Sequence, residues 1–258
     1  MTKIITVANQ KGGVGKTTTS VNLAAGLAVS EVHTLLIDMD PQANATIGCG
    51  IDYQSTDQNI YNVLVDGLDI NEHIHSTEIP FLEVVPSSPQ LVGAEIEMVS
   101  MISREIVLKK AISHLKKEYK YIIIDCPPSL GLLTINSLTA AQSVLIPIQC
   151  EYYAMEGLGQ LLNTIRLVQR NLNRDLQIEG VLITMYDSRL RLSQEVTEQV
   201  RSHFKEKVYN TIIRRNVRLG ESPSFGKPII LYDASAAGAQ DYMNLVGEIL
   251  QNDGQTTR

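Results

Sequence analysis

Short runs of apolar, β-branched residues alternate along most of the chain with longer segments in which apolar residues recur at helical spacing. Several of the runs, such as IIID, VLIPI and VLIT, are continuously hydrophobic. That pattern is typical of parallel strands that are buried on both faces of a sheet. The expected strands are Lys3–Ala8, Thr34–Asp38, Phe81–Val85, Tyr121–Asp125, Ser143–Ile148, Ile178–Met185 and Val208–Ile213.

Segments of helical period separate these strands. The clearest one carries an apolar stripe at i, i+3, i+4 and i+7 spacing, formed by Leu158, Leu161, Leu162, Ile165, Val168 and Leu172. The alternation predicts an α/β fold: a doubly wound, mostly parallel sheet flanked by helices, with right-handed crossovers. We expect a single domain over residues 1–251 and a flexible polar tail over residues 252–258, because no linker or repeat interrupts the pattern.

Composition excludes several classes of protein. With 44 % hydrophobic and 19 % charged residues in 258, the chain is not disordered, collagen-like or a coiled coil. No apolar run approaches the roughly 18 residues of a membrane span, and the start MTKIITVANQ is unlike a signal peptide. Cys49, Cys126 and Cys150 form no C-x-x-C pair. They are expected to be reduced thiols in a cytoplasmic protein.

Charge is unevenly distributed along the chain. The formal net charge is −6, yet residues 186–227 hold 9 basic and 5 acidic residues, a net of +4 (9 − 5). A local basic face for nucleic acid is compatible with this count. A solvated helix face gives similar counts, so the pattern leaves both readings open.

A glycine-rich loop follows the first strand and leads into the helix-forming stretch SVNLAAGLA. Strand, glycine-rich loop and helix in this order are typical of a phosphate-binding loop, in which backbone N–H groups and the helix N-terminus face the anion. Lys16 is expected to reach the β- and γ-phosphates and Thr17 to bind Mg²⁺. The common pattern has glycine where this chain has Gln10. The loop residues are Lys11, Gly12, Gly13, Val14, Gly15, Lys16, Thr17 and Thr18.

Acidic residues end two of the expected strands. Asp125 closes YIIID, the form of a Walker B strand whose aspartate holds Mg²⁺, usually through water. Asp38 and Asp40 follow the second strand at the same carboxyl edge of the sheet. One of the pair could polarise the attacking water. The alternative is that both are solvated carboxylates in a turn before Pro41.

Together these segments resemble the ParA (Soj) family of partition ATPases, within the deviant Walker A, MinD-like group of P-loop proteins. The resemblance rests on KGGVGKTTT, DMDPQANAT, YIIIDCPPSLGLLTINSL, PIQCEYYAMEGL, ITMYDSR and RRNVRLGESPSFGKPIILYD, which span nearly the whole chain. It implies ATP and Mg²⁺ as cofactors and a nucleotide-sandwich homodimer. The loop begins ten residues from the start, which resembles the short, chromosomal type without an N-terminal helix-turn-helix.

The resemblance also implies roles for single residues. Lys11 matches the signature lysine that reaches the partner's nucleotide, and Asp40 matches the acid that prepares the hydrolytic water. Met185, Arg214 and Asn216 fall in the nucleotide pocket, although the family usually has proline where this chain has Arg214. Arg189 and Arg218 match positions that bind double-stranded DNA non-specifically. The implied setting is the nucleoid, with a ParB-like centromere-binding partner that stimulates hydrolysis.

Three other functions share the nucleotide site. A membrane-associated MinD-like ATPase needs a basic amphipathic C-terminal helix, whereas AQDYMNLVGEIL contains no Lys or Arg. An iron-sulfur protein needs two suitably spaced cysteines per subunit, which the spacing of Cys49, Cys126 and Cys150 does not provide. A ParA-like ATPase that positions a protein cargo over the nucleoid is not distinguished from chromosome partition by the sequence.

Overall fold

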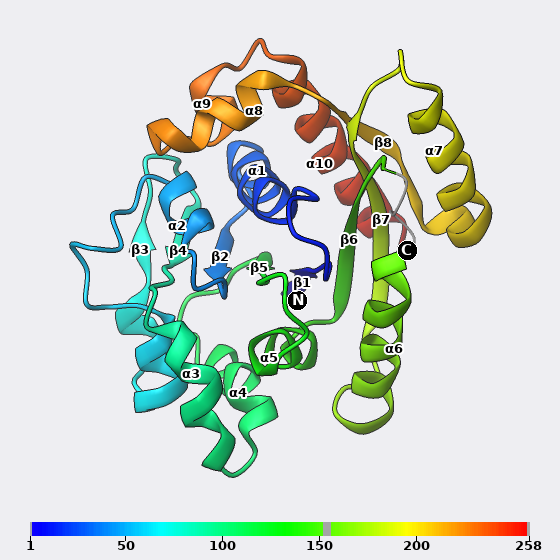
Figure 1. Ribbon diagram of the computed structural model, residues 1–258. Helices are drawn as coiled ribbons and strands as arrows, with labels where there is room; N and C mark the ends of the chain where they lie inside the picture. Colours follow the sequence, from blue (N-terminus) through cyan, green and yellow to red (C-terminus); the bar gives the residue numbers. More distant parts are fainter. Residues whose placement is uncertain (1, 152–155, 257–258) are drawn as a thin grey trace.

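The computed structural model describes residues 2–151 and 156–256. Within them the chain forms one sheet in the order β3-β4-β2-β5-β1-β6-β7-β8 (Figure 1). Every strand pair is parallel except β3–β4, which is antiparallel at one edge. The strands are β1 (Lys3–Val7), β2 (Thr34–Asp38), β3 (His75–Ser76), β4 (Leu82–Val85), β5 (Tyr121–Asp125), β6 (Ser143–Gln149), β7 (Gln177–Tyr186) and β8 (Val208–Arg214).

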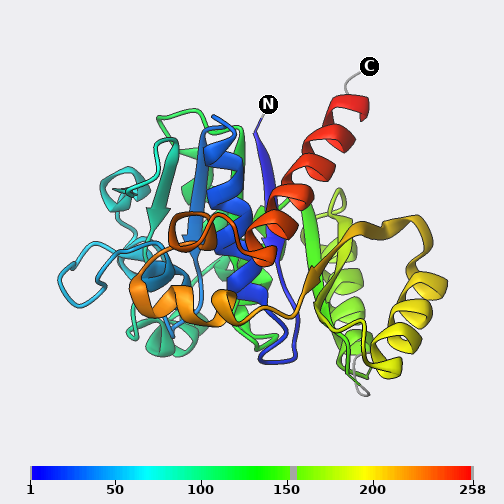
Figure 2. The same cartoon turned by 90° about the horizontal axis from the view of Figure 1, so that it is seen from above.

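Helices cover both faces of this sheet (Figures 1 and 2). One face is packed by α1 (Lys16–Val29), α2 (Asn44–Gly48), α8 (Val217–Glu221), α9 (Ile229–Tyr232) and α10 (Ala237–Thr256). The other is packed by α3 (Leu91–Glu97), α4 (Val107–Ser113), α5 (Leu132–Ala140), α6 (Glu156–Asn171) and α7 (Arg191–Phe204). None of the helices in the described part of the chain is long and apolar enough to span a bilayer.

Each face of the sheet has its own hydrophobic core. Successive side chains of a strand point to opposite faces, so Ile122 and Ile124 join one core while Ile123 joins the other. All five residues of β2 and of β5 are buried. The continuously apolar runs in the sequence are therefore strands covered on both sides, as parallel sheets require.

The predicted doubly wound α/β architecture is confirmed. Each of the seven predicted strands is present, with ends that differ by at most one residue. The predicted apolar stripe lies on α6, except for Leu172, which follows the last residue of that helix. The edge strand β3 was not predicted, because two residues carry no alternation from which a strand can be recognised. Residues 152–155 of the PIQCEYYAMEGL segment and the last two residues of the predicted tail lie outside the described residues.

The expectation of a flexible tail from residue 252 is wrong for the described part of that segment. Helix α10 continues to Thr256. Asp253 lies beside β1, where its carboxylate accepts a hydrogen bond from Lys3 Nζ at 2.6 Å. The hydroxyl of Tyr121 also donates to this carboxylate. Polar composition suggested disorder, whereas one acid on the last turns of the helix finds two partners at the amino edge of the sheet.

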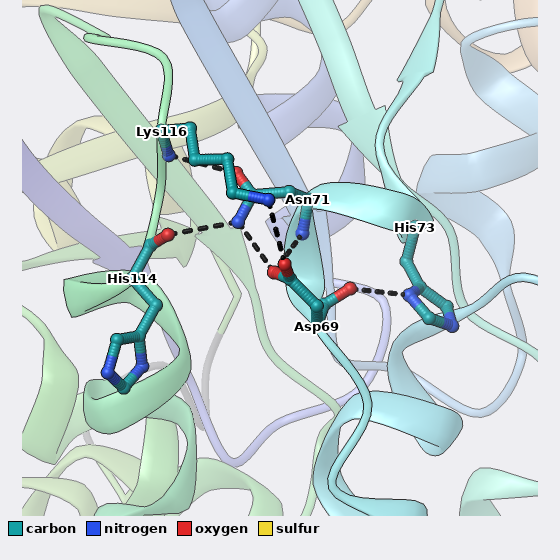
Figure 3. A network of polar contacts seen from close by, with 5 residues as sticks. All are labelled: Asp69, Asn71, His73, His114 and Lys116. Carbon is teal, nitrogen blue, oxygen red and sulfur yellow. Dashed lines mark hydrogen bonds and ion pairs between the residues drawn. The ribbon is translucent and has the colours of Figure 1, made fainter.

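A polar network joins residues 69–73, which precede β3, to the residues that follow α4 (Figure 3). Asp69 accepts hydrogen bonds from the backbone and side chain of Asn71 and from Lys116 Nζ, while Asn71 Nδ2 also donates to the carbonyl of His114. A cavity of about 610 Å³ lies against this network. It is lined by none of the residues that the sequence predicted for the nucleotide site.

Candidate nucleotide site

The glycine-rich loop lies between β1 and α1, at the carboxyl edge of the sheet. Gly13 and Gly15 have φ of 75° and 88°, the left-handed region in which glycine is unstrained. The hydroxyl of Thr184 donates to the carbonyl of Val14 at 2.8 Å and so ties the loop to β7.

The N-terminus of α1 faces this loop. Among the described residues, no side chain caps its N-terminus and no acidic residue lies in its first turn. A helix end of this kind presents free N–H groups and partial positive charge, which suit an anion. Val14 and Lys16 are buried, whereas Gly12 and Gly13 are exposed. The end of the loop that leads into α1 is therefore buried, whereas its middle, at Gly12 and Gly13, is exposed to solvent.

Lys16 has only 6 % of its surface exposed. Its Nζ donates to the carbonyl of Lys11 at 3.1 Å, which folds the side chain back under the loop. Burial lowers the pKa of this ammonium, and the charges of Asp125 and Asp40 act in the opposite direction. The lysine is therefore placed where a phosphate would replace a neutral carbonyl with a stronger, charged acceptor.

Asp125 combines with residues of α1 in an arrangement that suits a hydrated cation. One carboxylate oxygen accepts a hydrogen bond from Ser20 Oγ at 2.7 Å, and the other is buried and has no hydrogen-bond partner among the described residues. Burial and the negative charge of Asp38 raise its pKa to about 8, while the hydrogen bond from Ser20 acts against this. An orphaned buried carboxylate oxygen beside the Thr17 hydroxyl fits Mg²⁺ and its water ligands.

The structure separates the two acids that follow β2. Asp38 is fully buried, and both of its oxygens are engaged, one by the backbone N–H of Asp40 and the other by the backbone and hydroxyl of Thr46. Asp40 is 6 % exposed, and one of its oxygens accepts a hydrogen bond from the backbone N–H of Gln42. The chain does turn after Asp40, but neither carboxylate is solvated, so the alternative of two solvated acids is wrong. Asp38 has a structural set of partners, and Asp40 is the better candidate for the reaction.

A cavity of about 210 Å³ adjoins the loop and collects the residues predicted for the base. Met185, which has φ of 52°, comes from the end of β7, and Arg214 and Asn216 come from the end of β8. Gly15 and Thr18 were predicted as loop residues. The remaining lining residues were not predicted, although Thr184 and Arg215 are direct neighbours of predicted ones. The full lining is Gly15, Thr18, Thr184, Met185, Ile213, Arg214, Arg215, Asn216, Leu219, Gly220 and Tyr242.

Lys11 does not line this cavity. Its Nζ pairs with Glu151 at 2.6 Å, with 32 % and 48 % of the two side chains exposed. Glu151 is also held by Gln149 at the end of β6, and the side chain of Asn9 accepts a hydrogen bond from the backbone of Lys11. A half-exposed pair of this kind contributes little to stability, so the lysine is free to exchange partners.

The two arginines predicted to contact DNA are exposed but paired. Asp187 holds Arg189 through both of its oxygens, and 85 % of the arginine side chain is exposed. Arg218 is 53 % exposed and pairs with Glu221 at 2.9 Å. The loop after β7 and the chain at and after the end of β8 line one cavity of about 570 Å³. It is lined by Tyr186, Asp187, Ser188, Arg189, Ile212, Arg214, Arg215 and Val217.

Comparison with known proteins places this site in a family. A model described as an AAA domain matches residues 2–178. Sporulation initiation inhibitor protein Soj of Bacillus subtilis is 59 % identical over 252 residues, which cover 98 % of this chain and 100 % of that protein. Chromosome partitioning protein ParA of Myxococcus xanthus is 55 % identical over 251 residues, covering 97 % of this chain and 89 % of that protein.

A solved structure is similar in both sequence and fold. It is the crystal structure of cobyrinic acid a,c-diamide synthase from Mycobacterium smegmatis with bound ADP and magnesium. The two chains are 38 % identical, with a TM-score of 0.80 over 88 % of this chain and 93 % of that one.

Proposed function

We propose, from the premise that the chain belongs to the Soj/ParA family of chromosome-partitioning ATPases, that it is a nucleotide-controlled DNA-binding switch. ATP with Mg²⁺ is its ligand, the ATP-bound form is a homodimer, and that dimer binds double-stranded DNA without sequence preference. Hydrolysis returns it to the weakly binding form. The observation that carries this proposal is the glycine-rich loop together with two features near it: the carboxylate oxygen of Asp125 that has no hydrogen-bond partner among the described residues, and the 210 Å³ cavity.

The chain's own residues divide the work at the phosphates. Backbone N–H groups of residues 12–18 and the ammonium of Lys16 bind and orient the triphosphate. Thr17 and Asp125 would hold Mg²⁺, the aspartate through water, and a bound Mg²⁺ neutralises charge on the phosphate oxygens. Asp40 orients the attacking water and accepts its proton. Asp38 keeps the loop that carries Asp40 in place through Thr46.

Dimerisation supplies the second half of the switch. On dimerisation, Lys11 leaves its ion pair with Glu151 and binds the nucleotide of the partner subunit. The exposed residues Gly12 and Gly13 of the loop face the partner. Because nucleotide binding and association are thermodynamically linked, ATP stabilises the dimer. A ParB-like centromere-binding protein stimulates hydrolysis in this assembly and releases the DNA. The protein accordingly works at the nucleoid.

The decisive experiment measures DNA binding by the full chain in three nucleotide states. Fluorescence anisotropy with a labelled duplex of arbitrary sequence is recorded with ATP and Mg²⁺, with ADP and Mg²⁺, and without nucleotide. We expect binding at micromolar protein only with ATP. Lys16→Ala is the matched control and should bind DNA equally weakly in all three states. Equal wild-type affinity in all three states contradicts the proposed switch.

A further inference from the structure

Arg214 and Asp241 form an ion pair with three guanidinium hydrogen bonds at the edge of the 210 Å³ cavity. The guanidinium donates to Asp241 through Nε at 3.0 and 3.1 Å and through a terminal nitrogen at 2.6 Å. The carboxylate side chain is 6 % exposed, whereas that of Arg214 is 53 % exposed. Bidentate pairs between arginine and a shielded carboxylate fix geometry as well as charge. Asp241 therefore holds Arg214 in one orientation.

The same carboxylate also binds the main chain. The backbone N–H of Arg214 donates to Asp241 at 2.9 Å, and the next N–H, of Arg215, donates to the carbonyl of Tyr186 at 2.9 Å. Two consecutive peptide groups are thus fixed, one to α10 and one to β7. They immediately precede Asn216, whose side chain caps the start of α8 by accepting from the backbone of Arg218 at 2.9 Å. The cavity-lining stretch 214–216 takes its position from these bonds.

The first turns of α10 form part of the same wall. Tyr242, next to Asp241, lines the cavity, and its hydroxyl lies 3.1 Å from that of Thr19 on α1. A Cβ on Gly238 would meet the side chain of Leu219 at 2.7 Å, and Leu219 also lines the cavity. Helix α10 therefore packs directly against residues that line the cavity. Among the described residues, Asp241 is the only carboxylate of α10 that is hydrogen-bonded to the stretch 214–216.

We propose that Asp241 is a positioning residue for the base end of the nucleotide site. By holding Arg214 at its backbone and its guanidinium, it sets the position of residues 214–216 and so the affinity for the adenine of ATP. It has no part in binding the phosphates. The inference rests on the proposed function, because it takes the 210 Å³ cavity as the site of the base. Nothing in it requires contact between Asp241 and the nucleotide.

The test separates the base from the phosphates by using two probes. Titration calorimetry measures the affinity of wild type and Asp241→Asn for ATP and for inorganic tripolyphosphate, both with Mg²⁺. Loss of charge-assisted hydrogen bonds at the wall should weaken ATP binding roughly tenfold. Tripolyphosphate, which has no base, should bind both proteins with affinities within about twofold of each other, a difference of less than roughly 0.5 kcal/mol.

A matched control lies two turns further along α10. Glu248 also accepts hydrogen bonds from backbone N–H groups of β8, those of Asn210 and Thr211, but it does not line the cavity. Glu248→Gln should therefore bind both probes like the wild type. Thermal unfolding of both variants establishes that they are folded at the titration temperature. If Glu248→Gln weakens ATP binding as much as Asp241→Asn does, the effect is general loosening of α10 and the positioning role is wrong.

Rescue by proline provides a second, independent readout. The N–H of Arg214 takes no part in the sheet, so proline at this position costs no strand hydrogen bond and fixes φ by its ring. Two double variants that both lack the guanidinium differ only in how the backbone is held. Arg214→Pro combined with Asp241→Asn should bind ATP at least about threefold more tightly than Arg214→Ala combined with Asp241→Asn, a difference of roughly 0.7 kcal/mol. Equal affinities for these two double variants overturn the claim that backbone position is what Asp241 provides.

The remaining outcomes distinguish this inference from the function on which it rests. If the wild type prefers ATP over tripolyphosphate but Asp241→Asn keeps the full preference, Asp241 has no positioning role and the nucleotide site stands. If the wild type itself binds ATP no better than tripolyphosphate, the cavity does not take the base, and both the inference and that part of the proposed function are overturned.

Discussion

Two acids separated by one residue have different surroundings at the end of β2. Asp38 is the last residue of the strand, and its side chain lies inside the fold against Thr46. Its burial raises its pKa to about 6, and three hydrogen bonds oppose that effect. Asp40 lies beyond the strand, with one oxygen bonded to the backbone of Gln42. The position of both acids after a strand left the pair equivalent, and the family resemblance favoured Asp40. The hydrogen bonds distinguish them in the same sense.

Substitution of each acid should therefore have a different effect. Asp40→Ala should keep the fold and ATP binding, form dimers and lose hydrolysis, because only the positioning of water is removed. Asp38→Ala should instead lower the free energy of unfolding by about 2–4 kcal/mol, since it leaves the donors of Thr46 and Asp40 unpaired. Phosphate release and urea denaturation measure the two effects. Near-normal turnover in a folded Asp40→Ala protein would assign water positioning to another residue.

Lys11 and Lys16 should also be separable, although both lie in one loop. Lys16 is buried under the loop, whereas Lys11 is half-exposed and paired with Glu151. Lys11→Ala should leave ATP binding by the monomer within about twofold of wild type, a difference near 0.4 kcal/mol, and should prevent ATP-driven dimerisation. Equilibrium titration and light scattering measure the two properties.

Lys116→Ala is the matched control, because Lys116 is likewise exposed and paired, with Asp69, but lies in the network of Figure 3. It should form ATP-driven dimers normally. The role of Lys11 across the dimer is refuted if its alanine variant also dimerises normally. Weakened binding of ATP to the Lys11→Ala monomer would instead show that the lysine serves its own subunit.

At the scale of elements, the sequence predicts best what is local and periodic. Buried parallel strands such as β5 are recognised because every residue is apolar up to the final Asp125. Contacts between segments far apart in the chain have no such signature. Arg214–Asp241 joins the end of β8 to α10, and Lys11–Glu151 joins the glycine-rich loop to the chain just after β6. Only folding brings these segments together. The residues predicted for the loop and for the base are adjacent in space, but the ion pairs and hydrogen bonds that hold them there could not be predicted from the sequence.

The end of α10 shows the same limit and can be tested directly. Asp253 joins the helix to Lys3 on β1 and to Tyr121 on β5. Asp253→Ala should lower the free energy of unfolding by about 1–3 kcal/mol, because a partly buried Lys3 and Tyr121 each lose an acceptor. Urea denaturation followed by circular dichroism measures this.

Gln251→Ala, an exposed position on the same helix, is the control and should change stability by less than about 0.5 kcal/mol. An Asp253→Ala protein as stable as this control would support a frayed helix end instead of an anchored one.

Charge is the property that belongs to the whole molecule. A chain with net charge −6 repels DNA at long range unless its basic residues are grouped. The 570 Å³ cavity groups Arg189 and Arg215, and Arg218 follows in α8. Asp187 and Glu221 neutralise two of these arginines. One copy of this surface is therefore a weak attractant, and two copies held together gain through effective concentration without any new contact.

This reasoning makes DNA affinity a property of the dimer. Arg189→Glu and Arg218→Glu should each abolish ATP-dependent DNA binding while ATP binding and dimerisation persist, because both side chains are exposed and neither lines the 210 Å³ cavity. Wild-type binding should not depend on DNA sequence, since such contacts go to phosphates. Its affinity should fall with salt at a log–log slope of about −0.9 per phosphate neutralised.

Arg174→Glu provides the matched change of charge. Arg174 is exposed and precedes the amino end of β7, so it lies at the opposite edge of the sheet from Arg189, which follows the carboxyl end of that strand. A general effect of net charge would weaken this variant as much as the other two. A local surface predicts that Arg174→Glu binds DNA nearly as well as wild type at equal salt. If all three variants bind DNA as tightly as the wild type in the anisotropy assay, the contact surface lies elsewhere on the dimer.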